Sequence, residues 1–297
     1  MLFRSGFIDE KHMISFSRGR RNVKLWDVDS GKVVKVTKFT EKRRFEDLVI
    51  SNNGQMVVCS QASPMTQHTD KELCLIAIDT TSFTHKFLRQ EGEQLSLFNA
   101  KISDDGKYLV NLVQYSQPLL WNLLTGKLVC KLFNAEAYER ASAVAVSGSS
   151  MTAITAANDI GIKIWSVESG QIIRTITCSD VSEVNVSPDG GAIISRSANS
   201  NSFDAWDMKT TKHLASFTTD GSPNHVKTIG DRIALALGEN PNLMVLHLYR
   251  PSHKEVEEMK SPYDGLSTDV TIVGFQEKLT VEDGFDDDKD DDDSYIC

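Results

Sequence analysis

Few residues of this 297-residue chain are spaced for catalysis or metal binding. Its seven histidines are scattered, without an HExxH pair or the paired cysteines of a zinc site. It contains no P-loop and no GxSxG nucleophile motif, and the Gly-Lys pairs at 31–32 and 126–127 precede Val and Leu, as in ordinary turns. The sequence therefore predicts a protein that is not an enzyme, with no metal ion and no cofactor.

Basic side chains are a second kind of chemistry-bearing residue, and they gather in a few short segments. Arginine makes bidentate contacts with carboxylates, so such segments suit an acidic protein or peptide partner. Solvated loop charges are the alternative interpretation. The predicted partner-binding residues are Arg18, Arg20, Arg21, Lys42, Arg43, Arg44, Arg89, Tyr138 and Arg140.

The acidic residues concentrate at the C-terminal end. Residues 282–293 contain nine acids and one lysine, a net −8 of the formal −9. Such a run cannot bury enough apolar surface to order itself, so residues 282–297 are predicted to be a disordered tail. The tail either solvates the protein or contacts basic residues. Because the rest is nearly neutral, nucleic acid is not an expected partner.

Four tryptophans indicate which secondary-structure elements position these residues. Each tryptophan lies in a similar sequence segment: NVKLWDVDSGKVV from 22, QPLLWNLLTGKLV from 117, GIKIWSVESGQII from 161 and SFDAWDMKTTKHL from 202. Alternating apolar residues predict a strand, and the following turn predicts a hairpin. We interpret Trp26, Trp121, Trp165 and Trp206 as core residues, against the alternative of a ligand-stacking set.

Two further phrases are degenerate copies. The segment from 72 places Ile76 and Ala77 where the others have Trp and a polar residue, and the segment from 242 places Leu246 and His247 there. A repeat of 40 to 50 residues, here 44 and 41 between the last three tryptophans, is typical of repeat architectures.

A second turn signal precedes each tryptophan, as in Ser187-Pro188-Asp189-Gly190, and joins another hairpin. Two hairpins make a four-stranded antiparallel unit with two apolar faces, and such units bury both faces only by stacking. The predicted fold class is all-β, a β-propeller of six full units plus a partial seventh that begins with the apolar run from 269.

These phrases resemble the WD-repeat family, whose units combine a Ser-Pro-Asp-Gly-like turn with a strand ending in Trp-Asp, as at Trp26-Asp27 and Trp206-Asp207. In that family a Gly-His pair often supplies the histidine of a network with the Trp. No Gly-His occurs here, so unit stability is expected to rest mainly on packing. A weaker resemblance is to the C-terminal propellers of NACHT and WD-repeat signalling proteins.

The domain prediction is a propeller over residues 1–281, part of a larger propeller in one interpretation, followed by the tail. The resemblance implies a non-catalytic scaffold or sensor that docks a protein or peptide on its loop-bearing rim. The alternatives are a propeller enzyme with a site in the central channel, and the regulatory module of a signalling ATPase. No apolar run suits a membrane, and five widely spaced cysteines favour the cytoplasm, or else the nucleus.

Overall fold

The computed structural model describes most of the chain through residue 249 and one later strand. The described residues are 3–17, 22–39, 44–62, 74–90, 95, 97, 99–113, 117–132, 141–157, 161–187, 189–219, 223–229, 232–237, 243–249 and 271–275. Among these residues the only regular elements are β-strands, joined by turns.

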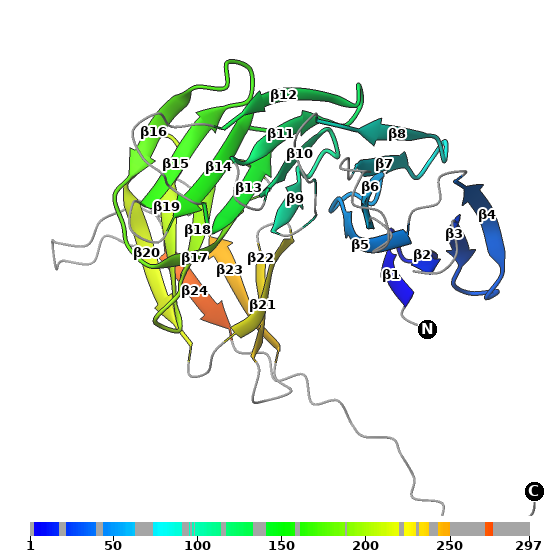
Figure 1. The fold of residues 1–297 in the computed structure, drawn as a ribbon. Helices are drawn as coiled ribbons and strands as arrows, with labels where there is room; N and C mark the ends of the chain where they lie inside the picture. Colours follow the sequence, from blue (N-terminus) through cyan, green and yellow to red (C-terminus); the bar gives the residue numbers. More distant parts are fainter. Residues whose placement is uncertain are drawn as a thin grey trace, which may run out of the picture.

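The strands form six four-stranded antiparallel sheets that follow one another along the chain (Figure 1). The first two sheets are β1 (Phe3–Phe7), β2 (His12–Ser17), β3 (Asn22–Asp27), β4 (Val33–Lys38), and β5 (Arg44–Ile50), β6 (Met56–Ala62), β7 (Leu75–Asp79), β8 (His85–Leu88). The third and fourth are β9 (Ala100–Ile102), β10 (Tyr108–Asn111), β11 (Leu119–Asn122), β12 (Lys127–Lys131), and β13 (Ala143–Ser147), β14 (Thr152–Ala157), β15 (Gly161–Ser166), β16 (Ile172–Ile176). The last two are β17 (Val181–Val186), β18 (Ala192–Ser197), β19 (Ser202–Asp207), β20 (His213–Thr218), and β21 (Pro223–Ile229), β22 (Arg232–Leu237), β23 (Leu243–Tyr249), β24 (Thr271–Phe275). The prediction of repeated four-stranded antiparallel units is confirmed.

Each of the first four interfaces between consecutive sheets has its own apolar core. Residues of the first and second sheets share one cluster, which includes Phe16 and Val57. Similar clusters join the second to the third sheet, the third to the fourth, and the fourth to the fifth. The first strand of each sheet also contacts the first strand of the next sheet, from β1 with β5 through to β17 with β21. Among the described residues, no contact of comparable extent joins the first sheet to the sixth.

The turn between the third and fourth strands repeats in five sheets. In the first sheet Asp27 Oδ1 accepts a hydrogen bond from the Ser30 backbone N–H at 2.8 Å, and Gly31 takes a positive φ of 63°. The equivalent positive-φ residues, each four places after the polar residue, are Phe83, Gly126, Gly170 and Thr211. The polar residue after each tryptophan therefore caps this turn.

That turn corrects the alignment of the second unit. Asp79 Oδ1 accepts from the Ser82 backbone N–H at 2.7 Å, as Asp27 does from Ser30, so Asp79 is the capping residue. Ile78, which pairs with Val57 on β6, therefore takes the tryptophan position. The prediction that Ile76 and Ala77 occupy these places was wrong by two residues.

The predicted partial seventh unit is also corrected. Residues 271–275 pair antiparallel with β23, Leu246 opposite Gly274, and so complete the sixth sheet instead of opening another. Without β24, β23 would present an unpaired apolar edge, which proteins avoid. The placement of Leu246 in the sixth unit agrees with the register, since it lies opposite Ile233 as Trp206 lies opposite Ile193.

Candidate functional site

The four tryptophans occupy equivalent places on the third strands of their sheets. Trp121 and Trp165 are 1% and 2% exposed, while Trp26 and Trp206 are partly buried. Trp121, Trp165 and Trp206 face the preceding sheet and lie within or against the inter-sheet cores, as Trp165 does when it packs with Leu120 of the third sheet. Trp26, in the first sheet, is not part of the core between the first and second sheets.

Each indole N–H also donates to the second strand of its own sheet. The acceptor lies two residues beyond the one opposite the tryptophan, as for Trp165, which pairs with Ala153 and donates to Thr155 Oγ1. The four donor–acceptor distances are 2.6 Å for Trp26 to Ser15, 2.9 Å for Trp121 to Asn111, 3.0 Å for Trp165 to Thr155 and 2.9 Å for Trp206 to Ser195. The hydrogen-bonded network with the tryptophan was expected to be missing because the chain has no Gly-His pair. Its indole hydrogen bond is nevertheless present, without a histidine.

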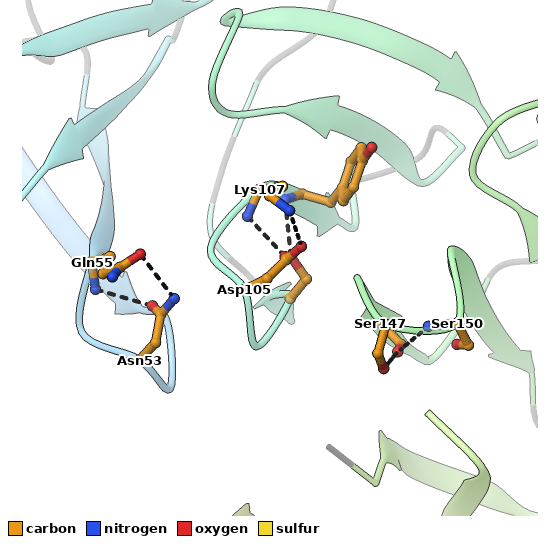
Figure 2. A network of polar contacts seen from close by, with 9 residues as sticks. Asn53, Gln55, Asp105, Lys107, Ser147 and Ser150 are labelled. Carbon is orange, nitrogen blue, oxygen red and sulfur yellow. Dashed lines mark hydrogen bonds and ion pairs between the residues drawn. The ribbon is translucent and has the colours of Figure 1, made fainter. Parts of the chain in front are cut away.

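Polar turns between the first and second strands of neighbouring sheets form a network of polar contacts. In the third sheet, the Ser103 hydroxyl donates to Asp105 Oδ1 at 2.6 Å, and the Lys107 ammonium lies 3.1 Å from Asp105 Oδ2. Figure 2 shows this turn with the Asn53 turn of the second sheet and the Ser147 turn of the fourth. Each turn satisfies its own polar groups, since Asn53 Oδ1 likewise accepts from the Gln55 backbone N–H.

Neighbouring turns are packed closely against one another. Asn52 Nδ2 donates to Asp104 Oδ1 at 2.6 Å, which links the second sheet to the third. A Cβ atom at Gly54 would lie 1.8 Å from the Ile8 carbonyl oxygen, and one at Gly148 would lie 2.3 Å from the Asp105 carboxyl carbon. At Gly54 the obstacle is backbone of the preceding sheet, so glycine is required there, whereas at Gly148 the Asp105 carboxylate would have to move aside.

The two carboxylates of the third-sheet turn have opposite pKa shifts. Burial raises the pKa of Asp104 above its ordinary 3.8, with the Asp105 charge adding to the rise and the Asn52 hydrogen bond opposing it. For Asp105 burial is again the largest influence and acts upward, but hydrogen bonds from Ser103 and Lys107 and the Lys107 charge together lower the pKa. Among the described residues no group of three or more histidines, cysteines or acids could hold a metal ion. We therefore assign the turns to inter-sheet packing.

A cluster of Asp204, His213 and Ser216 was missed by the sequence analysis. The His213 ring nitrogen Nε2 lies 3.0 Å from both Asp204 Oδ1 and Ser216 Oγ, and the Ser216 hydroxyl donates to Asp204 at 2.6 Å. In a catalytic triad the two ring nitrogens have different partners. Here both partners meet one nitrogen, so the cluster ties β20 to β19 and cannot relay a proton to an activated serine. A register shift beside Trp206 brings His213 there, and the sequence pattern does not reveal it.

One ion pair joins two first strands that are not neighbours. The Lys101 ammonium on β9 lies 3.5 Å from Glu183 Oε1 and 3.3 Å from Asn185 Oδ1 on β17. Asn185 Nδ2 in turn lies 3.3 Å from Glu183 Oε1. The cation and the carboxylate satisfy one another across the fourth sheet, which is a structural arrangement for both groups.

Of the predicted partner-binding residues, two lie among the described residues. Arg89 follows β8 and is exposed, with its guanidinium carbon 5.1 Å from the centre of the Phe87 ring. Arg44 begins β5. Outside the described residues lie Arg18, Arg20, Arg21, Lys42, Arg43, Tyr138 and Arg140, as does the tail at 282–297.

The strand ends nevertheless show where two of the basic segments start and finish. Asn22 pairs with Lys38, and Ser17 lies at the same end of the first sheet because it pairs with Phe3 at the start of β1. The segment 18–21 joins Ser17 to Asn22, and the segment after Phe39 leads to Arg44. Both basic segments are thus anchored at one end of the sheet.

None of the known protein-family models matches this chain, and no curated protein sequence is significantly similar to it. The described part of the chain contains no helix of the length and apolarity needed to cross a membrane.

Proposed function

We propose that this chain is a WD-repeat-like propeller that serves as a non-catalytic scaffold for protein–protein interaction. Its partner, an acidic protein or peptide, docks on the sheet end that carries the basic segments. The observation that supports this proposal is that Ser17, Asn22 and Lys38 lie at one end of the first sheet, from which residues 18–21 and the segment leading to Arg44 start. In the proposal, the six basic residues of these two segments share one rim, where carboxylates can be held in pairs.

The stacking of Arg89 on Phe87 supports the same surface. A guanidinium held over an aromatic ring loses less side-chain freedom when a carboxylate binds, so it is a favourable contact point. The described polar clusters satisfy one another, which favours a binding role over catalysis. Cys59, Cys74, Cys130 and Cys178 are not joined in disulfides, which supports a reducing, cytoplasmic location.

The proposal is tested with a fluorescent synthetic peptide that copies residues 282–293, used as an acidic probe. We expect saturable binding to the full chain and stronger binding to residues 1–281, mainly at low salt, because the tail competes for the same rim and screening is weak there. Reversal of Arg20, Arg21, Arg43 and Arg44 to Glu should abolish binding. Lys32→Glu, an exposed charge in the turn at the opposite end of the first sheet, is the matched control.

Anisotropy titrations at low and high ionic strength measure the outcome. Equal affinity of both chain lengths at every salt concentration would remove the tail from the proposal. Equal loss with the arginine reversals and with Lys32→Glu would show general attraction to charge, and the docking rim would have to be abandoned.

A further inference from the structure

The turn between β5 and β6 contains an asparagine followed by a glycine, Asn53 and Gly54, and this pair occurs once in the chain. The Asn53 side chain is exposed. An asparagine in this setting can lose its side-chain ammonia without an enzyme, because a glycine has no Cβ to obstruct the approach of its nitrogen to the asparagine carboxamide. The turn therefore carries a reactive group that its packing role does not explain.

The hydrogen bonds of Asn53 are those of an aspartate in two other sheets. Asn53 Oδ1 accepts from the Ser51 hydroxyl at 2.7 Å and from the Gln55 backbone N–H at 3.0 Å. Asp105 and Asp189 accept the corresponding two bonds in the third and fifth sheets. An aspartate at position 53 would thus keep the turn's own hydrogen bonds.

The turn that Asn53 faces is charged. A Cβ atom at Gly106 would lie 3.4 Å from Asn53 Oδ1, so the carboxamide lies beside the third-sheet turn. That turn carries Asp104 and Asp105 with one cation, Lys107, and has a net charge of −1. A carboxylate at position 53 would be repelled by it.

The aspartate of the third sheet faces a different environment. A Cβ atom at Gly148 would lie 2.3 Å from the Asp105 carboxyl carbon, and the turn at 147–151 has no charged residue. The carboxylate therefore lies opposite a neutral turn, and the amide of Asn53 opposite a charged one. Burial and the Asp105 charge already raise the pKa of Asp104, and a further negative charge would act in the same direction.

We propose that Asn53 is a site of spontaneous deamidation, and that the new carboxylate weakens the contact between the second and third sheets. The backbone nitrogen of Gly54 attacks the side-chain carbonyl carbon of Asn53. The amide nitrogen leaves as ammonia with the Gly54 N–H proton, and a cyclic succinimide forms. Water then adds to the ring and opens it to aspartate or isoaspartate. This site is distinct from the basic rim, so the proposal does not rest on the proposed function.

The isoaspartate product affects the other neighbour of the turn. It lengthens the backbone by one carbon atom immediately before Gly54. A Cβ atom at Gly54 would already lie 1.8 Å from the Ile8 carbonyl oxygen of the first sheet, so the longer backbone has no room there. Aspartate disturbs the contact with the third sheet, and isoaspartate also that with the first.

The folded turn controls the rate of this reaction. The Gly54 N–H donates to the Ser51 carbonyl oxygen at 2.9 Å, and Asn53 Oδ1 is held by its own two hydrogen bonds. These bonds must break before the two groups can react. A surface turn opens locally without unfolding of the whole protein, so the reaction proceeds in the folded chain.

The first experiment measures deamidation of the folded full chain at mildly alkaline pH, in water labelled with heavy oxygen, by peptide mass spectrometry. We expect the label to enter at Asn53 sooner than at Asn199 and Asn201, which precede serine. Ser51→Ala should speed the reaction at Asn53 by ~3-fold or more, because it removes one hydrogen bond that holds the side chain. Ser103→Ala, the same change in the third-sheet turn, is the matched control and should leave that rate unchanged.

The second experiment measures the effect of the product by urea unfolding of Asn53→Asp. We expect the equilibrium constant for unfolding to rise ~2- to 5-fold at low salt, and less at high salt, where exposed charges are screened. In the Asp104→Asn background the same change should cost much less, because the repelling charge is gone.

The proposal is overturned if Asn53 stays intact during the incubation, or reacts no faster than Asn199 and Asn201. Equal acceleration by Ser51→Ala and Ser103→Ala overturns it as well, since general unfolding and not the opening of this turn would then expose the site. An effect of Asn53→Asp that neither salt nor Asp104→Asn reduces refutes the repulsion between the two turns.

Discussion

Replacing Thr155 by Val tests whether the indole hydrogen bonds stabilise the sheets. The Trp165 indole N–H donates to Thr155 Oγ1 at 3.0 Å, and the two residues are 2% and 7% exposed. Valine keeps the size and branching of threonine but cannot accept. The indole N–H would be left buried without a partner, which costs about 1–3 kcal/mol.

Ser15→Ala is the matched change in the first sheet. Ser15 accepts from the Trp26 indole at 2.6 Å, but Trp26 is partly exposed, so water can replace the lost acceptor. The expected loss of about 0.5–1.5 kcal/mol is that of an ordinary hydrogen bond. The same bond should therefore contribute less to stability at the partly exposed Trp26 than at the buried Trp165.

Urea unfolding followed by far-ultraviolet circular dichroism measures both changes as midpoint shifts at unchanged slope. The double variant Thr155→Val with Trp165→Phe supplies the cycle: once the donor is gone, the valine should cost little, giving a coupling of about 1 kcal/mol or more. Equal losses for Thr155→Val and Ser15→Ala, or no coupling in the cycle, would refute the argument that the buried bond contributes to stability.

Two further predictions concern the turns between strands. Gly54→Ala should lower the melting temperature clearly more than Gly31→Ala. A Cβ atom at Gly54 would lie 1.8 Å from a backbone oxygen, whereas a Cβ atom at Gly31 would have no heavy atom within 4 Å. At Gly31 the positive φ alone costs roughly 1–2 kcal/mol. Similar melting temperatures would show that the Gly54 turn can move away from the first sheet. Because the pKa of Asp104 is raised in the folded protein, its stabilising contribution belongs to the protonated form and is lost as the pH rises through that pKa, above 3.8. The stability of Asp104→Asn relative to the wild type, measured by urea unfolding, should therefore increase with pH over this window, and a decrease would contradict the assigned shift.

The repeat unit could be predicted from sequence because strand alternation and turn chemistry coincide. The Ser187-Pro188-Asp189-Gly190 signal predicted a turn, and the Ser187 hydroxyl does donate to Asp189 at 2.5 Å while Gly190 has a positive φ of 69°. Each of these residues has a local reason for its type. No distant contact was needed to locate the hairpin.

The error at Ile76 has an equally physical cause. Side chains alternate with a period of two, so a shift of two residues moves no side chain to the other face and leaves the apolar pattern unchanged. Ile76 and Ile78 are both fully buried and satisfy the pattern equally well. Only the capping role of Asp79 separates the two alignments, and that role depends on the turn geometry.

The prediction for residues 271–275, which form the edge strand β24, was wrong for a different reason. Its sequence, Thr-Ile-Val-Gly-Phe, fits a first strand or a fourth strand equally, because both are short and apolar. Which one forms depends on the free edge of β23, a long-range pairing that local patterns do not contain. The prediction of a basic rim has the same limitation. Clusters of charged residues in the sequence show which loops are basic, but they do not show how these loops lie relative to one another.

The indole bonds also separate two sources of stability in this repeat. The Trp26 bond to Ser15 joins two strands of the first sheet, so it belongs to the folding of a single sheet. Burial of Trp165 requires the third sheet and belongs to stacking. A repeat protein gains stability from both kinds of contribution, those within units and those between neighbours. It follows that the Trp26 bond stabilises the first sheet by itself, whereas the Trp165 bond lies in a core that two stacked sheets share.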